Sequence, residues 1–171
     1  MAKTLIGTCS WTDPSLIAAG TFYPPEIKTP EARLRYYALH FPIVEVDSSY
    51  YALPGERTSA LWAARTPSHF LFDIKAFSLF THHPTRVRSL PKDILTELPV
   101  EVADKDRVYL HQLPQEAVDE LWTRFQRSLA PLVEVGKMSV VVCQFPPWYT
   151  PSRANREYIS RVHSEAQGAA G

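Results

Sequence analysis

Cysteine is scarce in this chain, which has two cysteines among 171 residues. Cys9 and Cys143 form neither a disulfide framework nor a four-ligand zinc spacing, so we expect free thiols in a reducing compartment. No apolar run approaches the ~18 residues of a transmembrane helix, and the first residues lack the apolar segment of a signal peptide. These absences predict a cytoplasmic protein without a membrane partner.

The chain also lacks an excess of charge of either sign, because 18 Lys and Arg residues balance 18 Asp and Glu residues. Nucleic-acid-binding domains usually carry a basic excess, so we expect no nucleic-acid partner. The glycine-rich motifs that bind NAD or ATP are absent, as is the G-x-S-x-G motif of lipases, and we predict no cofactor. The 45% hydrophobic content is sufficient for the core of one domain.

Four short apolar runs predict buried strands, because they are rich in β-branched and aromatic residues and too short for typical helices. They are residues 5–9, 43–47, 70–75 and 138–144. Strands that alternate with helices favour an α/β fold with a parallel sheet, and we expect the strand order to follow the sequence.

Three helices are predicted between the runs. The first follows Thr29 as its N-cap and extends to about His40. The second begins near Glu56 and stops before Pro67, and the third begins at Pro114 and ends at Pro131. We interpret residues 81–112 as a long insertion and residues 161–171 as a disordered tail.

Five short motifs together resemble the YecE-like family, also called domain of unknown function 72. They are residues 7–11, 22–24, 44–54, 70–75 with 81–82, and 144–147. The resemblance covers residues 5–159 and only the N-terminal half of the family pattern, because two later motifs, Glu-x-Arg-His-like and Arg-x-His-Gly-like, are missing. Asp47 stands where the family usually has Asn.

The resemblance implies a TIM-barrel-like (β/α) fold whose biochemical function is not established. Such a barrel needs eight strands and the sequence offers about four, so residues 1–160 are expected to form an incomplete barrel domain. Two explanations stay open, a truncated reading frame and a half-barrel that closes with itself or with another chain. Both predict self-association through open sheet edges.

Candidate site residues follow from the barrel, whose active sites lie at the C-terminal ends of the strands. Alternation places Glu45 with Asp47, and Asp73 with Lys75, on the face that points into the barrel. Glu45 and Lys75 are the predicted catalytic acid/base pair, and a structural ion pair is an equal alternative. The predicted substrate-binding residues at the same end are Trp11, Asp47, Tyr51, His82 and Gln144.

Three weaker interpretations each have a simpler alternative. A divalent metal held by Glu45, Asp47, His82 and His83 competes with ordinary loop histidines, and we expect no metal. Cys9 as a nucleophile competes with a small buried residue. Aromatic residues near the strand ends either stack on a ligand ring or cover the mouth of the barrel.

The sequence therefore leaves three functions open, and whether the chain is an enzyme is undecided. The first is a barrel enzyme, or a truncated remnant of one, that binds a polar small molecule. The second is a nucleic-acid-binding or repair-associated module, which rests on analogy of fold alone. The third is an inactive fragment.

Overall fold

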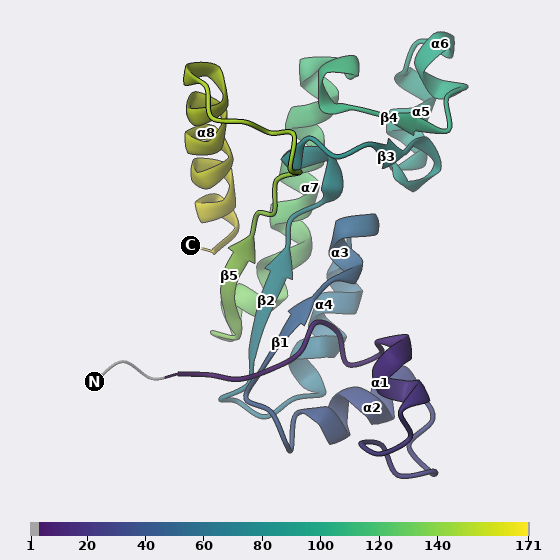
Figure 1. The fold of residues 1–171 in the computed structure, drawn as a ribbon, viewed down its shortest axis with the longest axis vertical. Coiled ribbons are helices and arrows are strands. Elements are labelled where there is room, and N and C mark those ends of the chain that lie inside the picture. Colours follow the sequence, from purple (N-terminus) through teal and green to yellow (C-terminus); the bar gives the residue numbers. More distant parts are fainter. Residues whose placement is uncertain (1–3, 171) are drawn as a thin grey trace.

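A three-stranded parallel sheet lies at the centre of the computed structural model, which describes residues 4–170 (Figure 1). Its strands are β1 (Ile43–Val46), β2 (Leu71–Lys75) and β5 (Met138–Val142), in the order β1-β2-β5. Both pairs are parallel. The α/β class and the parallel order along the sequence are therefore as predicted, and these three strands are an open sheet.

The first predicted strand is wrong. Residues 5–9 contribute a single parallel bridge, between Cys9 and Glu45. Glu45 donates its N–H to the Thr8 carbonyl at 3.1 Å, and Ser10 donates to the Glu45 carbonyl at 2.8 Å. Ser10 then has a φ of 68°, a left-handed conformation that turns the chain away and ends the pairing.

Burial alternates along the two central strands, as the period of two requires. Val44 and Val46 of β1, and Phe72 and Ile74 of β2, are at most 1% exposed. Trp62 stacks on Phe72 from the helical side, with ring centroids 6.2 Å apart. Glu45, Asp73 and Lys75 are consequently on the opposite face of the sheet.

Helices α2 (Pro30–Tyr37), α4 (Glu56–Ala64) and α7 (Gln115–Glu134) correspond to the three predicted helices. Thr29 caps α2 by accepting a hydrogen bond from the Ala32 N–H at 3.1 Å. Pro131 does not end α7, contrary to expectation, and lies inside it. Leu129 and Leu132, on either side, are fully buried, and this packing offsets the hydrogen bond that proline cannot make.

The insertion forms a separate lobe beyond the C-terminal ends of the strands (Figure 1). A two-stranded antiparallel sheet, β3 with β4, lies within it. Its elements are η1 (Ser78–Thr81), β3 (Thr85–Arg86), η2 (Val87–Ser89), α5 (Lys92–Glu97), α6 (Val100–Ala103), β4 (Arg107–Val108) and η3 (Leu110–Gln112).

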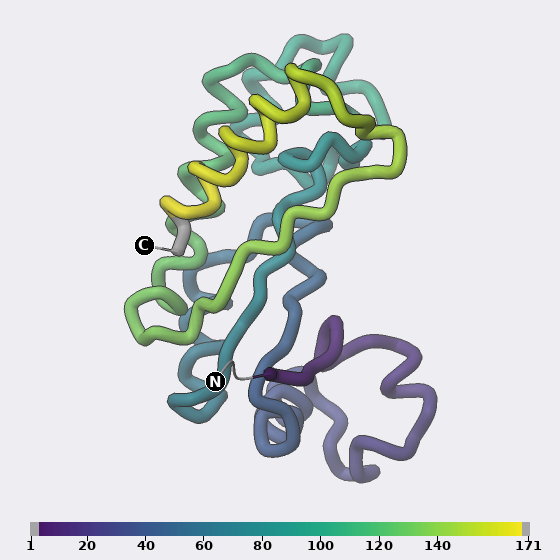
Figure 2. Tube along the Cα trace, turned by 60° about the vertical axis from the view of Figure 1, so that its left-hand side comes forward, coloured from purple at the N-terminus to yellow at the C-terminus, as the bar shows by residue number. Residues whose placement is uncertain are grey.

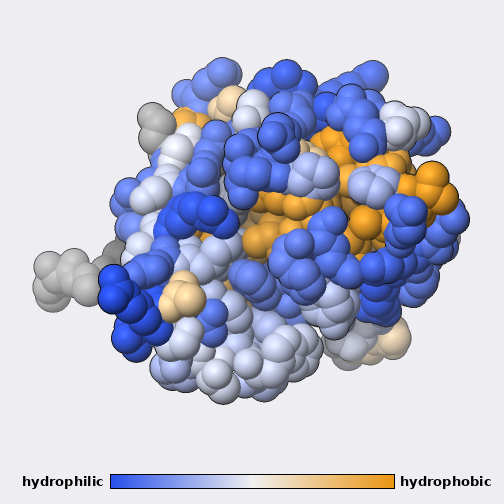
Figure 3. Space-filling view, turned by 90° about the horizontal axis from the view of Figure 1, so that it is seen from above, coloured by the Kyte–Doolittle hydropathy of each residue, from blue (hydrophilic) through white to orange (hydrophobic). Residues whose placement is uncertain are grey.

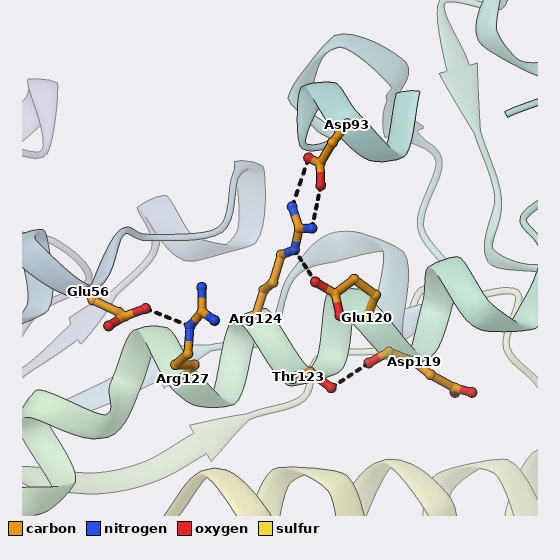
Figure 4. Close-up of polar contacts among 7 residues, drawn as sticks. All are labelled: Glu56, Asp93, Asp119, Glu120, Thr123, Arg124 and Arg127. Atoms are coloured by element: carbon orange, nitrogen blue, oxygen red, sulfur yellow. Dashed lines mark hydrogen bonds and ion pairs between the residues drawn. The ribbon is translucent and has the colours of Figure 1, made fainter. Parts of the chain in front are cut away.

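Arg124 ties this lobe to helix α7. Its guanidinium pairs with both carboxylate oxygens of Asp93 in α5, and its Nε donates to Glu120 one turn earlier at 2.6 Å (Figure 4). Arg127 reaches Glu56 at the start of α4, also at 2.6 Å (Figure 4). One face of α7 thus connects the lobe to helix α4, which packs on the sheet through Trp62.

The C-terminal segment differs from the predicted disordered tail. Residues up to Ala170 form helix α8 (Arg153–Ala170), and Gly171 lies outside the described residues. Val162 is only 2% exposed, and Gln126 of α7 donates to the Glu165 carbonyl at 3.0 Å. α8 therefore packs beside α7, as the tube in Figure 2 also shows.

The two remaining short helices are α1 (Pro14–Ala18) and α3 (Ser48–Tyr51). α1 and α2 lie at the opposite end of the sheet from the lobe (Figures 1 and 2). Seen from the lobe end, hydrophilic residues surround an area of hydrophobic ones (Figure 3). Across residues 4–170, every helix is too short or too polar to cross a membrane.

Candidate functional site

A lysine lies between two carboxylates where β1 and β2 end. The Lys75 ammonium donates to Asp47 Oδ1 at 3.0 Å and is 3.7 Å from Glu45 Oε1. The side chains of Lys75, Glu45 and Asp47 are 17%, 22% and 30% exposed, respectively. The structure thus brings Glu45 and Lys75 together as we expected, and it adds Asp47 as the closer partner. We call these three residues the Lys75 cluster.

Opposing effects act on the pKa of Lys75. Burial lowers it, whereas the hydrogen bond to Asp47 and the charges of both carboxylates raise it, and the net result is a raised pKa. Lys75 is therefore an ammonium ion at neutral pH. In this form it donates a proton or stabilises negative charge, but it cannot accept a proton.

Cys9 touches the edge of the Lys75 cluster from the N-terminal segment. Burial raises the pKa of its thiol, and the nearby Glu45 carboxylate raises it further. Cys9 is therefore a neutral thiol at neutral pH, which is a poor nucleophile. The neutral thiol does not favour the interpretation of Cys9 as a nucleophile, and its exposed side chain does not fit the alternative of a small buried residue.

Ser49 fixes the ends of the two strands relative to each other. Its buried hydroxyl lies 2.7 Å from the Val46 carbonyl and 2.6 Å from the Lys75 carbonyl. A hydroxyl has one proton, so the two carbonyls share a single donor. This positioning role could not be predicted from the sequence, because the contact to Lys75 joins residues 26 positions apart.

Asp73 adds a carboxylate to the same face of the sheet. It is the β2 residue in register with Glu45 of β1. Its Oδ1 is buried and has no hydrogen-bond partner among residues 4–170. An unpaired buried acceptor of this kind is costly in free energy.

A cleft of about 700 Å³ lies next to the Lys75 cluster, with the Tyr50 ring between them. The Lys75 ammonium is 5.4 Å from the centroid of that ring, a cation–π contact. Helix α3 and the loop after β5 form part of the wall, and the insertion lobe forms the rest. The lining residues are Tyr50, Tyr51, Ser78, His83, Pro84, Thr85, Arg86, Arg88, Ser89, Arg107 and Trp148.

The predicted substrate-binding residues fall in different places. Asp47 is in the Lys75 cluster, and Tyr51 lines the cleft with 64% of its surface exposed. Gln144 is exposed and makes no hydrogen bond within residues 4–170. Trp11 is 8% exposed, and its indole N–H donates to the Pro30 carbonyl at 3.2 Å. Trp11 thus lies largely in the core, and its contact with a ligand stays a prediction.

The two adjacent histidines point in different directions. His82 has a φ of 60°, and its ring packs against Tyr149 and Tyr158, away from the cleft. His83 lines the cleft instead, 5.3 Å from the Tyr50 ring. Which of the two histidines lines the cleft could not be predicted from the sequence, because the left-handed turn at His82 is not evident from the residue types.

The side chains of this region offer little support for a metal site. Nowhere in residues 4–170 do three His, Cys, Asp or Glu side chains lie close enough to hold a metal ion together. The chemistry that the site offers is that of a protonated lysine, two or three carboxylates and a cleft lined by arginine and aromatic side chains.

Known proteins resemble this chain over most of its length. A family model described as "Protein of unknown function DUF72" matches residues 5–169. The narrower expectation, of a resemblance to the N-terminal half alone, is not borne out by this match. The UPF0759 protein YunF of Bacillus subtilis (strain 168) is 29% identical over 154 residues, which are 90% of this chain and 44% of YunF.

Solved structures of DUF72 family proteins are also similar to this chain. A DUF72 family protein from Thermotoga maritima has a TM-score of 0.61 and 26% identity, covering 94% of this chain and 51% of that protein. A DUF72 family protein from Enterococcus faecalis has a TM-score of 0.55 and 25% identity, covering 77% and 43%. The chain thus spans about half the length of the relatives it matches, or less.

Proposed function

The chain belongs to the DUF72 family of proteins of unknown function, and we propose that it is an acid/base enzyme for a polar small molecule. The molecule would bind where β1 and β2 end, with one part in the cleft and its reacting atoms at the Lys75 cluster. The observation that carries the proposal is the Lys75 ammonium, held 3.0 Å from Asp47 and 3.7 Å from Glu45 beside an open cleft.

Each residue of the Lys75 cluster has a separate role in this proposal. Glu45 accepts a proton from the substrate, because its carboxylate is only 22% exposed and lies on the open face of the sheet. Lys75 stabilises the negative charge that develops and returns a proton. Proton transfer from Glu45 to Lys75, whose Oε1 and Nζ are 3.7 Å apart, then restores both groups. Asp47 keeps Lys75 protonated and in position.

The fold supports this location by analogy. We propose that the sheet is part of a TIM-barrel-like (β/α) architecture, in which the C-terminal ends of the strands carry the active site. Such an analogy supports a location and not a reaction. A purely structural ion pair is the competing explanation. The variants Glu45→Gln and Lys75→Met distinguish it from a catalytic pair.

A nucleic-acid-binding or repair-associated module is the second candidate. Three arginines around the cleft favour it, whereas the zero net charge of the chain opposes it. Binding to DNA that weakens steeply with added salt would support this candidate. An inactive fragment is the third, and it predicts neither binding nor turnover.

The test is conversion of small molecules from a cell extract freed of macromolecules, followed by mass spectrometry. Wild type is expected to deplete a component and Glu45→Gln to slow that conversion by about 100-fold or more, as expected for loss of a general base. Lys75→Met should slow it similarly. Glu157→Gln, which removes an exposed carboxylate on α8, is the matched control and should act as wild type.

Two results would oppose the proposal. Wild type that changes no component of the extract contradicts an enzyme. Conversion that survives Glu45→Gln at the rate of the Glu157→Gln control contradicts the assigned base.

A further inference from the structure

The cleft has three arginines in its lining and no carboxylate, and we infer that it binds the phosphate group of a small phosphate monoester carrying a flat ring. The inference rests on the proposed function, because it names the ligand class of the same site. Three observations carry it: a like-charge pair across a short sheet, arginines that the protein leaves poorly neutralised, and two exposed aromatic rings.

The like-charge pair consists of Arg86 and Arg107. They are directly opposite each other in the β3–β4 ladder, and both are exposed. Like charges at opposed positions destabilise an antiparallel pair, so this arrangement costs free energy in the absence of an anion. A bound anion removes that cost.

The arginines around the cleft are poorly neutralised by the protein itself. Within residues 4–170, Arg86 and Arg88 form no ion pair. Arg107 has one carboxylate near it, Asp106 at 3.6 Å, whose side chain is 83% exposed. Guanidinium groups that the protein neutralises only weakly match a phosphate in geometry as well as charge, because each offers a planar fork of N–H donors.

Lys75 lies behind the Tyr50 ring, where Asp47 and Glu45 balance its charge. Its ammonium is 5.4 Å from the centroid of the Tyr50 ring, which is part of the cleft wall. Burial lowers the pKa of His83, and the charge of Lys75 lowers it further, so His83 is neutral at pH 7. A phosphate in the cleft therefore meets arginines directly, and the atoms bonded to it extend toward Lys75.

Two aromatic side chains line the same cleft with most of their surface exposed. Tyr51 is 64% exposed and Trp148 is 62% exposed. Aromatic faces of this kind stack on flat rings, with a gain of free energy that does not depend on hydrogen bonds. The volume of about 700 Å³ accommodates a ring and a phosphate together, and lies in the ordinary range for small-molecule sites.

Binding of defined probes to the full chain tests the inference without any turnover. Isothermal titration with methyl phosphate, phenyl phosphate and phenol separates the contribution of the charge from that of the ring. Phenyl phosphate should bind about tenfold more tightly than methyl phosphate, and phenol should not bind measurably. Trp148→Ala should remove the preference for phenyl phosphate and leave methyl phosphate unchanged.

Variants of the arginines identify the phosphate site. Arg86→Gln and Arg107→Gln should each weaken phenyl phosphate binding about tenfold, the effect of losing one charge-assisted hydrogen bond. Arg107→Lys, which keeps the charge but loses the fork, should fall between wild type and Arg107→Gln. The matched control is Arg57→Gln, an exposed arginine on α4 outside the cleft lining, and it should bind as wild type. Circular dichroism establishes that each variant is folded.

Three outcomes would overturn the inference. The first is phenyl phosphate that binds no more tightly to wild type than to Arg86→Gln and Arg107→Gln. The second is phenyl phosphate that does not bind wild type at all. The third is a single-stranded oligonucleotide that binds more tightly than phenyl phosphate with a steep salt dependence, which would assign the arginines to a nucleic acid. None of these outcomes tests the acid/base proposal. The extract assay tests that proposal separately, by varying Glu45 and not the arginines.

Discussion

Replacement of Lys75 by methionine is the perturbation that most directly probes the Lys75 cluster as a unit. Lys75→Met keeps most of the side-chain volume and removes the charge. Asp47 and Glu45 then lie near each other with no cation between them. The free energy of unfolding should fall for this reason.

The size of this loss follows from the exposure of the three side chains. Exposed ion pairs contribute ~0.2–1 kcal/mol, and removing one partner of a buried pair costs ~3–5 kcal/mol. With 17%, 22% and 30% of their surfaces exposed, Lys75, Glu45 and Asp47 lie between these limits. We expect a loss of about 2 kcal/mol at neutral pH.

Urea unfolding followed by tryptophan fluorescence measures this difference. The matched control is Lys28→Met, because Lys28 is exposed and forms no ion pair within residues 4–170, and it should change stability by no more than ~0.5 kcal/mol. A loss at neutral pH no larger than that of Lys28→Met would refute the reasoning.

Three further predictions concern other parts of the structure. Lys137→Met should lower the free energy of unfolding in urea by about 2 kcal/mol, because the buried Lys137 ammonium donates to the carbonyls of Ala63 and Thr66 at the end of α4. Burial lowers the pKa of His82, as do nearby cationic groups, so the unfolded chain binds its proton more readily and wild-type stability falls as pH drops through 6.5. His82→Asn, which suits the left-handed backbone, should lessen that fall in thermal melts, and an unchanged pH profile would contradict this. Sedimentation should show self-association, because β5 pairs only with β2 in residues 4–170 and Val140 is 49% exposed; a monomer at all concentrations would contradict this.

The faces of the central strands could be predicted from the sequence, because burial in a sheet repeats every two residues. The spacing of Glu45 and Lys75 therefore placed both side chains on the open face. The capped start of α2 at Thr29 was predictable for a similar reason, since a cap depends on local residues. Local and periodic signals carried both inferences.

Features that depend on the path of a loop could not be predicted. Trp11 is in the core because its indole reaches Pro30, 19 residues away. The opposition of Arg86 and Arg107 arises only from the pairing of β3 with β4. Pro131 continues α7, and residues after Arg161 continue α8, because buried side chains outweigh the local signals that favoured an end. These are tertiary effects, and residue types alone do not encode them.

Titration of Lys75 tests the central claim most directly. Nuclear magnetic resonance of the lysine side chains, with Lys75 assigned from Lys75→Met, measures its pKa in the folded chain. We predict a pKa above the ordinary value of 10.5 for wild type, and a lower value in Asp47→Asn. A pKa at or below 10.5 that Asp47→Asn leaves unchanged would show that no carboxylate holds the charge of Lys75, and would contradict the site proposed here.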